Sequence, residues 1–330
     1  MSALSPAAFA WLAEFLKGRS GLALGQDKDY LLESRLLPIA RREGCAALEA
    51  LVAKLRAAPN APLAAAVVEA MTTNESYFFR DGAPFEHAAA QLAKLHALRP
   101  AGAPIRIWSA ACATGQEAYS LAMLVAEAGP ALGGRPVEIL GTDLSQEVLA
   151  RAREGLYTQF EVQRGLPIAR LVKHFRKDGT QWRISEALRS MVRWRGFNLL
   201  DAPSVLGRFD IVFCRNVLLY FDPPTRTRVL ERIAGVMAAD GLLYLGGAET
   251  VRGITTRFQP LAGQRGVCVP VGGPQPQAAA QPQAAAQPQA AAQPPAAVGT
   301  AARTGSGLAA PIGFAGRLGA NAGAVGSRST

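Results

Sequence analysis

Residues 105–120, IRIWSAACATGQEAYS, carry the clearest structural signal in the chain. The β-prone run 105–108 leads into a turn of small residues, and a helix-like run opens at Gln116-Glu117. A strand, a small-residue turn and a helix N-terminus make up the first βα unit of a Rossmann-like nucleotide site. The turn has the single glycine Gly115 where a dinucleotide fingerprint has three, and no Lys-Ser/Thr pair follows it. It therefore suits a nucleoside without a pyrophosphate, such as S-adenosylmethionine, although a turn that only packs helix against sheet has the same composition.

Composition and charge limit the class of protein. The 330 residues, 49% of them hydrophobic, are enough for about two domains with a buried core. No apolar run approaches the ~20 residues of a membrane span, and the N-terminus has no basic leader before an apolar core. The four cysteines form no CxxC pair and the three histidines have no metal-site spacing, so we expect a cytoplasmic protein without membrane insertion, disulfides or a metal. The net charge of +10 favours an acidic partner.

The first 82 residues are predicted to form a helical domain. Phe9, Leu12, Phe15 and Leu16 recur at i, i+3, i+6 and i+7, which makes one apolar stripe along a helix. Three more helical runs are predicted, at about 27–42, 46–57 and 63–71.

From about residue 104, runs of strand length alternate with helical runs, which predicts a parallel, doubly wound α/β sheet. The predicted strands are 105–108, 137–141, 192–197, 209–214, 242–245 and 266–269, and the predicted helices include 117–128, 146–153 and 225–238.

Two further segments lie outside the α/β pattern. Within 155–190, the runs 171–175 and 181–184 flank an Asp-Gly turn signal, which predicts a small inserted β-subdomain with a hairpin. After Val271 the composition becomes rich in Ala, Gln, Pro and Gly, so 273–330 is predicted to be a disordered tail without chemistry of its own. We therefore divide the chain into a helical domain at 1–82, an α/β domain at 83–272 and the tail.

Polar residues follow four of the predicted strands. Glu117 follows the first strand and its turn, Asp143 the second, Asn198 the third and Asn216 the fourth. Each has an ordinary explanation, because carboxylates favour and cap helix starts and asparagines occupy turns. Ligands of open α/β sheets bind at the carboxyl ends of the strands, so four such residues at one edge favour a ligand site. An acid after the second strand accepts from both hydroxyls of a ribose.

The segment 71–80, MTTNESYFFR, joins the two domains where the helical domain would close over a cofactor. With WSAACATGQEAYSLAM, GTDLSQEVLARAREGLY, FDIVFCRNVLLYFD and DGLLYLGGAE, it resembles the CheR family in order and spacing over about residues 5–270. These chemotaxis-receptor methyltransferases use S-adenosylmethionine to methylate receptor glutamates. The family pattern implies cofactor contacts from Asn74, Ser76, Arg80, Glu117, Asp143, Asn198, Leu199, Asn216 and Val217.

Two positions depart from the family pattern. Ala118 stands where the family usually has Pro, which is helpful but dispensable early in a helix, and Ser76 stands where Thr is common, with the hydroxyl kept.

The implied reaction moves a methyl group from a sulfonium to a carboxylate. A glutamate has an unperturbed pKa of about 4.3 and is ionised at neutral pH, so no general base is needed, and none stands out in the sequence. Arg80 is predicted to hold the attacking carboxylate or that of the cofactor, and Tyr220 to line the transfer site, with core packing as the other explanation for Tyr220.

The implied partner is the cytoplasmic domain of methyl-accepting chemoreceptors, reached by a monomeric enzyme recruited to membrane receptor arrays. Lys28, Arg35 and Arg42 recur at i, i+7 and i+14 on the second helix, with Arg41 beside them. We predict that this face docks the acidic methylation helices of the receptor, whereas a solvated basic face is the usual fate of such charges. Pro38 kinks the helix and makes the alignment approximate.

Two rival functions belong to other classes. One is a non-catalytic module that binds S-adenosylmethionine and docks on the receptor, and the intact motifs count against it. The other is a nucleic-acid methyltransferase, which would carry a motif such as Asn-Pro-Pro-Tyr after the fourth strand to grip a base. The chain has Arg215-Asn216-Val217-Leu218 there, so we expect no nucleic-acid partner.

Overall fold

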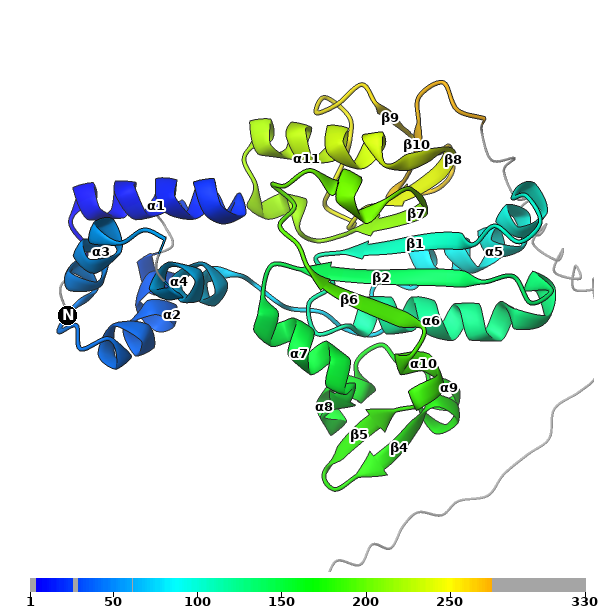
Figure 1. Ribbon diagram of the computed structural model, residues 1–330, viewed down its shortest axis with the longest axis horizontal. Coiled ribbons are helices and arrows are strands. Elements are labelled where there is room, and N and C mark those ends of the chain that lie inside the picture. Colours follow the sequence, from blue (N-terminus) through cyan, green and yellow to red (C-terminus); the bar gives the residue numbers. More distant parts are fainter. Residues whose placement is uncertain (1–3, 26–28, 61, 275–330) are drawn as a thin grey trace, which may run out of the picture. The chain divides into compact units, whose positions relative to one another are not determined.

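Four helices open the computed structural model, which describes residues 4–25, 29–60 and 62–274 (Figure 1). They are α1 (Pro6–Ser20), α2 (Asp29–Arg42), α3 (Leu48–Ala57) and α4 (Pro62–Met71). Their buried side chains form an apolar cluster of their own, in which Leu12 and Leu16 are fully buried while Phe9 and Phe15 pack at its edge. The predicted helices and the apolar stripe of the first one are confirmed. The tail from residue 275 onward lies outside the described residues.

The ends of α1 follow from its sequence. The Ser5 hydroxyl accepts a hydrogen bond from the Ala8 N–H, and Pro6 occupies the first turn. Gly21 ends the helix with a φ of 80°, and its N–H donates to the Lys17 carbonyl. A Cβ on Gly21 would lie 2.9 Å from the Phe221 ring, so only glycine allows the end of α1 to lie this close to the α/β domain.

A seven-stranded sheet forms the second domain, with the order β6-β2-β1-β7-β8-β10-β9. Its strands are β1 (Ile105–Ala110), β2 (Val137–Asp143), β6 (Val192–Gly196), β7 (Phe209–Cys214), β8 (Met237–Tyr244), β9 (Phe258–Pro260) and β10 (Val267–Pro270). The five strands from β6 to β8 run parallel, as predicted. The prediction is wrong for β10, which is antiparallel to β8 and β9. The connection 245–266, all of it described, contains no helix, and a parallel return requires a crossover.

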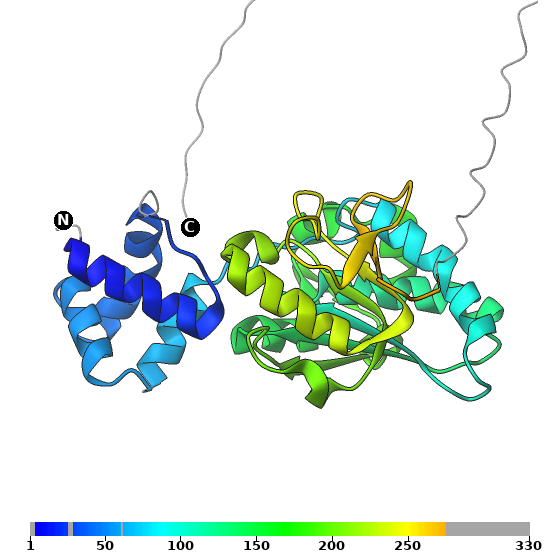
Figure 2. The same ribbon diagram turned by 90° about the horizontal axis from the view of Figure 1, so that it is seen from above.

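Helices cover both faces of this sheet (Figures 1 and 2). The main ones are α5 (Ala83–Leu98), α6 (Gln116–Ala128), α7 (Gln146–Glu154) and α11 (Pro223–Gly235), with 3₁₀ turns η2 (Gly129–Leu132), η3 (Pro203–Leu206) and η4 (Leu218–Tyr220). Alternate residues of β1 enter different clusters: Ile107 packs with α5 and α6, and Trp108 packs with α11. The helix predicted to run to 238 ends at Gly235, because β8 begins at Met237. Within the described residues, none of the helices is both long and apolar enough to cross a bilayer.

The insertion between α7 and β6 is a small subdomain, as predicted (Figure 1). It contains β3 (Leu156–Tyr157), α8 (Gln159–Gln163), α9 (Ile168–His174), β4 (Phe175–Asp178), β5 (Gln181–Ile184) and α10 (Glu186–Arg189), with the strand order β3-β5-β4. The hairpin turns at Gly179, whose φ is 58°. Residues 171–174, expected to be extended, are instead the end of α9. Helical spacing buries Leu171 and His174 on one side of α9 and leaves Val172 exposed.

Candidate active site

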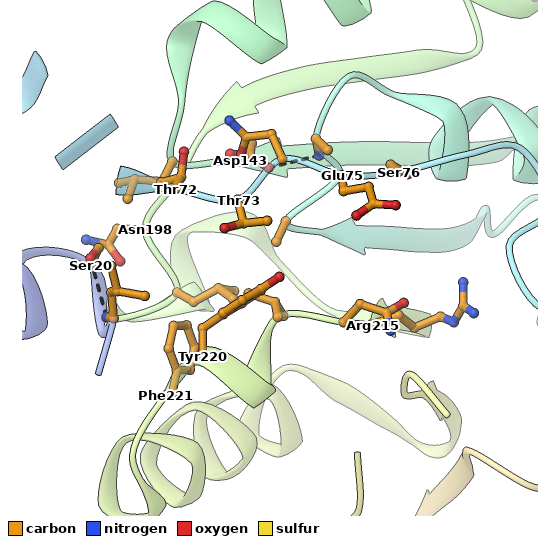
Figure 3. Close-up of a pocket in the computed structure, with 18 of the residues that line it drawn as sticks. Ser20, Thr72, Thr73, Glu75, Ser76, Asp143, Asn198, Arg215, Tyr220 and Phe221 are labelled. Carbon is orange, nitrogen blue, oxygen red and sulfur yellow. Dashed lines mark hydrogen bonds between the residues drawn. The ribbon is translucent and has the colours of Figure 1, made fainter. Parts of the chain in front are cut away.

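A cleft lies at the carboxyl ends of β6, β2, β1 and β7 (Figure 3). About 960 Å³ of empty space lies within it, counted with the open solvent at its mouth. Thr72 and Thr73 lie on one side of it, and Tyr220 and Phe221 lie on the other. All nine predicted cofactor-binding residues and Tyr220 line this one cleft: Asn74, Ser76, Arg80, Glu117, Asp143, Asn198, Leu199, Asn216 and Val217.

The turn after β1 shapes the floor of the cleft. Ala111 and Ala113 line it, and both adopt left-handed backbone conformations, with φ values of 58° and 49°. Gly115, with a φ of 93°, lies against Trp194 and Ala152 rather than in the cleft. A Cβ on Gly115 would lie 2.8 Å from the Trp194 ring and 3.0 Å from Ala152. The two alanines thus leave room for a ligand, while the glycine allows α6 to pack closely on its neighbours.

Asp143, at the end of β2, is fixed by the backbone around it. One carboxylate oxygen accepts from the Ala113 N–H at 2.9 Å, and the other accepts from the Ser145 N–H at 3.0 Å. Burial raises the pKa of Asp143, and these backbone donors oppose the rise. A carboxylate has about four lone-pair sites. Two bonds therefore leave acceptor capacity for the hydroxyls of a ligand.

Glu117 and Arg215 form a buried ion pair beside the cleft. The Arg215 Nη1 donates to Glu117 at 3.1 Å, and the Ser109 hydroxyl donates to the other carboxylate oxygen at 2.8 Å. Burial raises the pKa of Glu117, and the charge of Arg215 opposes this. The Arg215 Nη2 reaches Asp81 at 2.7 Å and the Arg80 carbonyl at 2.9 Å. Arg215 therefore connects a predicted cofactor residue to the segment that carries Arg80, a role that the sequence reasoning missed.

The two predicted catalytic residues differ in their surroundings. The Arg80 guanidinium donates to the Glu75 carbonyl at 3.2 Å and lies 5.3 Å from the centre of the Tyr77 ring, which leaves further donors for a ligand. Tyr220 packs against the apolar cluster that contains the buried side chains of α11, and it also lines the cleft. Its carbonyl accepts from the Ala23 N–H at 2.8 Å.

The two asparagines occupy turns as well as the cleft wall. The Asn198 side chain donates to the Arg19 carbonyl at 2.7 Å and accepts from the Leu200 N–H at 3.0 Å. Asn216 has a φ of 59°, a conformation that asparagine tolerates better than most residues.

Glu249 is a second residue that the sequence reasoning missed. Its carboxylate accepts from five backbone N–H groups, those of Gly246 and of the 216–219 loop, at 2.7 to 3.3 Å. The loop includes Asn216 and Val217 of the cleft wall. Glu249 ends the DGLLYLGGAE motif, so the sequence contained the signal but gave it no role.

The predicted docking residues do not all present free charges. The Arg35 guanidinium donates to the carbonyls of Met71 and Thr72 at 2.8 and 2.9 Å. Arg41 and Arg42 are exposed at the end of α2, and Arg42 lies 4.0 Å from a carboxylate oxygen of the adjacent glutamate. Lys28 lies outside the described residues. Arg35 therefore has an internal role that the basic face predicted from the sequence did not include.

The sheet, the buried acid after its second strand and the cleft at its carboxyl edge fit an S-adenosylmethionine-dependent methyltransferase. Two family models match the chain: the all-alpha domain of CheR methyltransferase at residues 7–72 and the SAM-binding domain of CheR methyltransferase at residues 74–267. The chain belongs to the CheR methyltransferase family.

Its relatives include chemotaxis protein methyltransferase Cher2 of Pseudomonas putida, which is 39% identical over 249 residues, covering 74% of this chain and 90% of that protein. Chemotaxis protein methyltransferase 1 of Pseudomonas aeruginosa is 39% identical, with the same coverage. The chemotaxis protein methyltransferase of Salmonella typhimurium is 34% identical over 268 residues, covering 79% of this chain and 90% of that protein.

Proposed function

We propose that this protein transfers the methyl group of S-adenosylmethionine to glutamate side chains of chemoreceptors, which yields methyl esters for chemosensory adaptation. The proposal is supported by the single cleft in which the predicted cofactor residues meet Arg80 and Tyr220. The relatives named as chemotaxis protein methyltransferases support the receptor as substrate.

The residues of the cleft fit S-adenosylmethionine. Asp143 keeps acceptor capacity for the ribose hydroxyls, and Arg80 has donors left for the carboxylate of the cofactor. Phe197, Leu199 and Val217 line the cleft and offer apolar surface to the adenine ring. When bound, the cofactor supplies an electrophilic methyl group on a sulfonium.

The chain's own contribution is orientation rather than proton transfer. Among the described residues that line the cleft there is no histidine, and its buried carboxylates, Glu117 and Asp143, are hydrogen-bonded to the protein. This suits a substrate carboxylate that is already ionised. Arg80 holds the incoming carboxylate or that of the cofactor, and Tyr220 forms the wall beside it and excludes water.

In this proposal the protein docks on its receptor through electrostatic attraction. The exposed Arg41 and Arg42 attract the acidic methylation helices of the receptor, together with Lys28, which lies outside the described residues. The protein acts as a cytoplasmic monomer that the receptor arrays recruit.

A labelling experiment tests the substrate. The full chain is incubated with methyl-labelled S-adenosylmethionine and receptor-containing membranes, and the labelled receptor is treated with mild alkali. A glutamate ester releases the label as methanol, whereas N-methyl groups survive the treatment. Receptor with its methylation-site glutamates replaced by glutamine is the matched control and should take up no label. Alkali-stable label would contradict the ester, and bound cofactor without any transfer would favour the non-catalytic module.

A further inference from the structure

The strap, defined here as residues 71–76, runs from the end of α4 along the cleft, and each of its residues lines that cleft. Arg35 of α2 donates hydrogen bonds to the first three residues of the strap. The Nη1 of Arg35 donates to the carbonyls of Met71 and Thr72 at 2.8 and 2.9 Å, and its Nη2 donates to the Thr73 hydroxyl at 3.1 Å. One guanidinium therefore contacts three consecutive residues of the cleft wall.

These contacts fill a specific need of the backbone. Met71 is the last residue of α4, and the final carbonyls of a helix have no partner within it. From Thr72 to Ser76 the strap forms neither helix nor strand, so no ladder of hydrogen bonds fixes its path. A cation at a helix C-terminus is also favoured by the helix dipole. Arg35 thus both satisfies the end of α4 and sets the direction in which the strap leaves it.

The same helix end is also tied to the α/β domain, through Glu69. A Glu69 carboxylate oxygen accepts from the Ser145 hydroxyl at 2.5 Å and from the Glu147 N–H at 2.9 Å, at the start of α7. The backbone N–H of Ser145 also donates to Asp143. The beginning of the strap is therefore held between α2 and the strand end that carries the buried acid.

We infer that Arg35 is a positioning residue of the cofactor cleft: it fixes the strap so that Asn74 and Ser76 face the ligand. This role goes beyond the proposed glutamate methylation and does not depend on it, because it concerns S-adenosylmethionine binding without receptor. It also differs from docking. Replacing a docking cation changes the affinity for the receptor and leaves the affinity for the cofactor unchanged. Replacing a residue that holds the strap changes the affinity for the cofactor even when no receptor is present.

Calorimetric titration of the full chain with S-adenosylmethionine, without receptor, tests this inference. Arg35→Ala should weaken binding about tenfold, since it removes hydrogen bonds from a charged donor. Arg35→Lys keeps the charge and part of the bonding, so it should weaken binding only about two- to threefold. Arg257→Ala is the matched control, because Arg257 is exposed, does not line the cleft, and makes no side-chain hydrogen bond or ion pair with the described residues.

The control should bind like the wild type. Unchanged affinity in Arg35→Ala would overturn the inference, and so would an equal loss in Arg257→Ala. Circular dichroism establishes that each variant is folded. If Arg35→Ala does not fold, Arg35→Lys and Arg35→Gln replace it: affinity falling in the order wild type, Lys, Gln supports the inference, and wild-type affinity in both refutes it. A rise in the KM for receptor with an unchanged KM for cofactor would identify Arg35 as a docking residue only.

Discussion

Removing the Glu249 carboxylate is expected to loosen the cleft wall that carries Asn216 and Val217. One carboxylate oxygen accepts from Val217 and Leu218 at 2.9 and 2.7 Å, and the other accepts from Asn216 and Gly246 at 2.8 and 2.7 Å. A fifth bond, from Leu219, is longer at 3.3 Å. In Glu249→Ala all five backbone donors lose this partner.

The size of the effect follows from these contacts. A hydrogen bond to a charged group contributes about 1.5–3 kcal/mol. Four short ones do not add in full, because Glu249 is only partly buried and water reaches the vacated donors. We expect Glu249→Ala to lower the free energy of unfolding by about 3–5 kcal/mol and to weaken S-adenosylmethionine binding about tenfold. Glu249→Gln keeps the volume of the side chain but points an amide N–H₂ at backbone donors. We therefore expect it to lower the free energy of unfolding by about 2–3 kcal/mol.

Urea unfolding followed by circular dichroism measures the stability, and calorimetry measures the cofactor affinity. Glu231→Ala is the matched control, since Glu231 is an exposed glutamate of α11, and it should change neither quantity. A loss below about 1 kcal/mol in Glu249→Ala, with normal cofactor binding, would refute the reasoning. The 216–219 loop would then hold its shape without the carboxylate.

Four further predictions concern the cofactor, pH, docking and the tail. Asp143→Ala should lose about 1.5–3 kcal/mol of S-adenosylmethionine binding by calorimetry, and unchanged affinity would remove Asp143 from the ribose. Hydrogen bonds from Thr225 and the Lys17 ammonium lower the pKa of Asp222 from 3.8 to about 2. The stability that Asp222 contributes should therefore be complete above about pH 4 and be lost as the pH falls toward 2, so the wild type and Asp222→Asn should converge in acid unfolding curves. Arg41→Glu with Arg42→Glu should raise the receptor KM at low salt and leave cofactor affinity alone; a normal receptor KM would place docking elsewhere. A chain ending at Gly272 should keep its turnover on a soluble receptor fragment, and a folded but inactive truncation would give the tail a role in chemistry.

Much of the fold was predictable because its signals are local. The run 209–214 was predicted to the residue, since a strand-length stretch that is apolar except for Asp210, between turn signals, indicates a buried parallel strand. The errors arose where tertiary context decides. Residues 171–174 fit a strand or a helix equally well over so short a run, and packing on the subdomain makes them helical. The direction of β10 is set by the connection before it, which contains no helix. The apolar pattern of a strand predicts the strand itself but not its direction.

The four polar residues that follow strands, Glu117, Asp143, Asn198 and Asn216, were placed together by one rule, whereas Asn74, Ser76 and Arg80 were implied only by the family resemblance. The groups that hold these residues in place were not predicted. Parallel strands bring their carboxyl ends to one edge, so residues that follow separate strands converge without any knowledge of side-chain contacts. Arg215 and Glu117 are 98 positions apart, and Arg35 and Met71 are 36 apart. No periodicity links such pairs. Only the packing of α2 on α4 within the helical domain brings Arg35 to the carbonyl groups that it contacts.

The packing of the helical domain on the α/β domain makes cofactor binding a property of both domains. On one side of the cleft, Lys17 of α1 pairs with Asp222 at 3.0 Å, and Leu22 forms a β-bridge with Phe221, the neighbour of Tyr220. On the other side, Glu69 of α4 holds the start of α7. A ligand that needs both walls in place binds only when both sets of contacts are formed. Its binding therefore adds a free energy of RT ln(1 + [L]/Kd) to the stability of the domain junction. By the same linkage, substitutions in the helical domain that break these contacts weaken cofactor affinity without touching the cofactor.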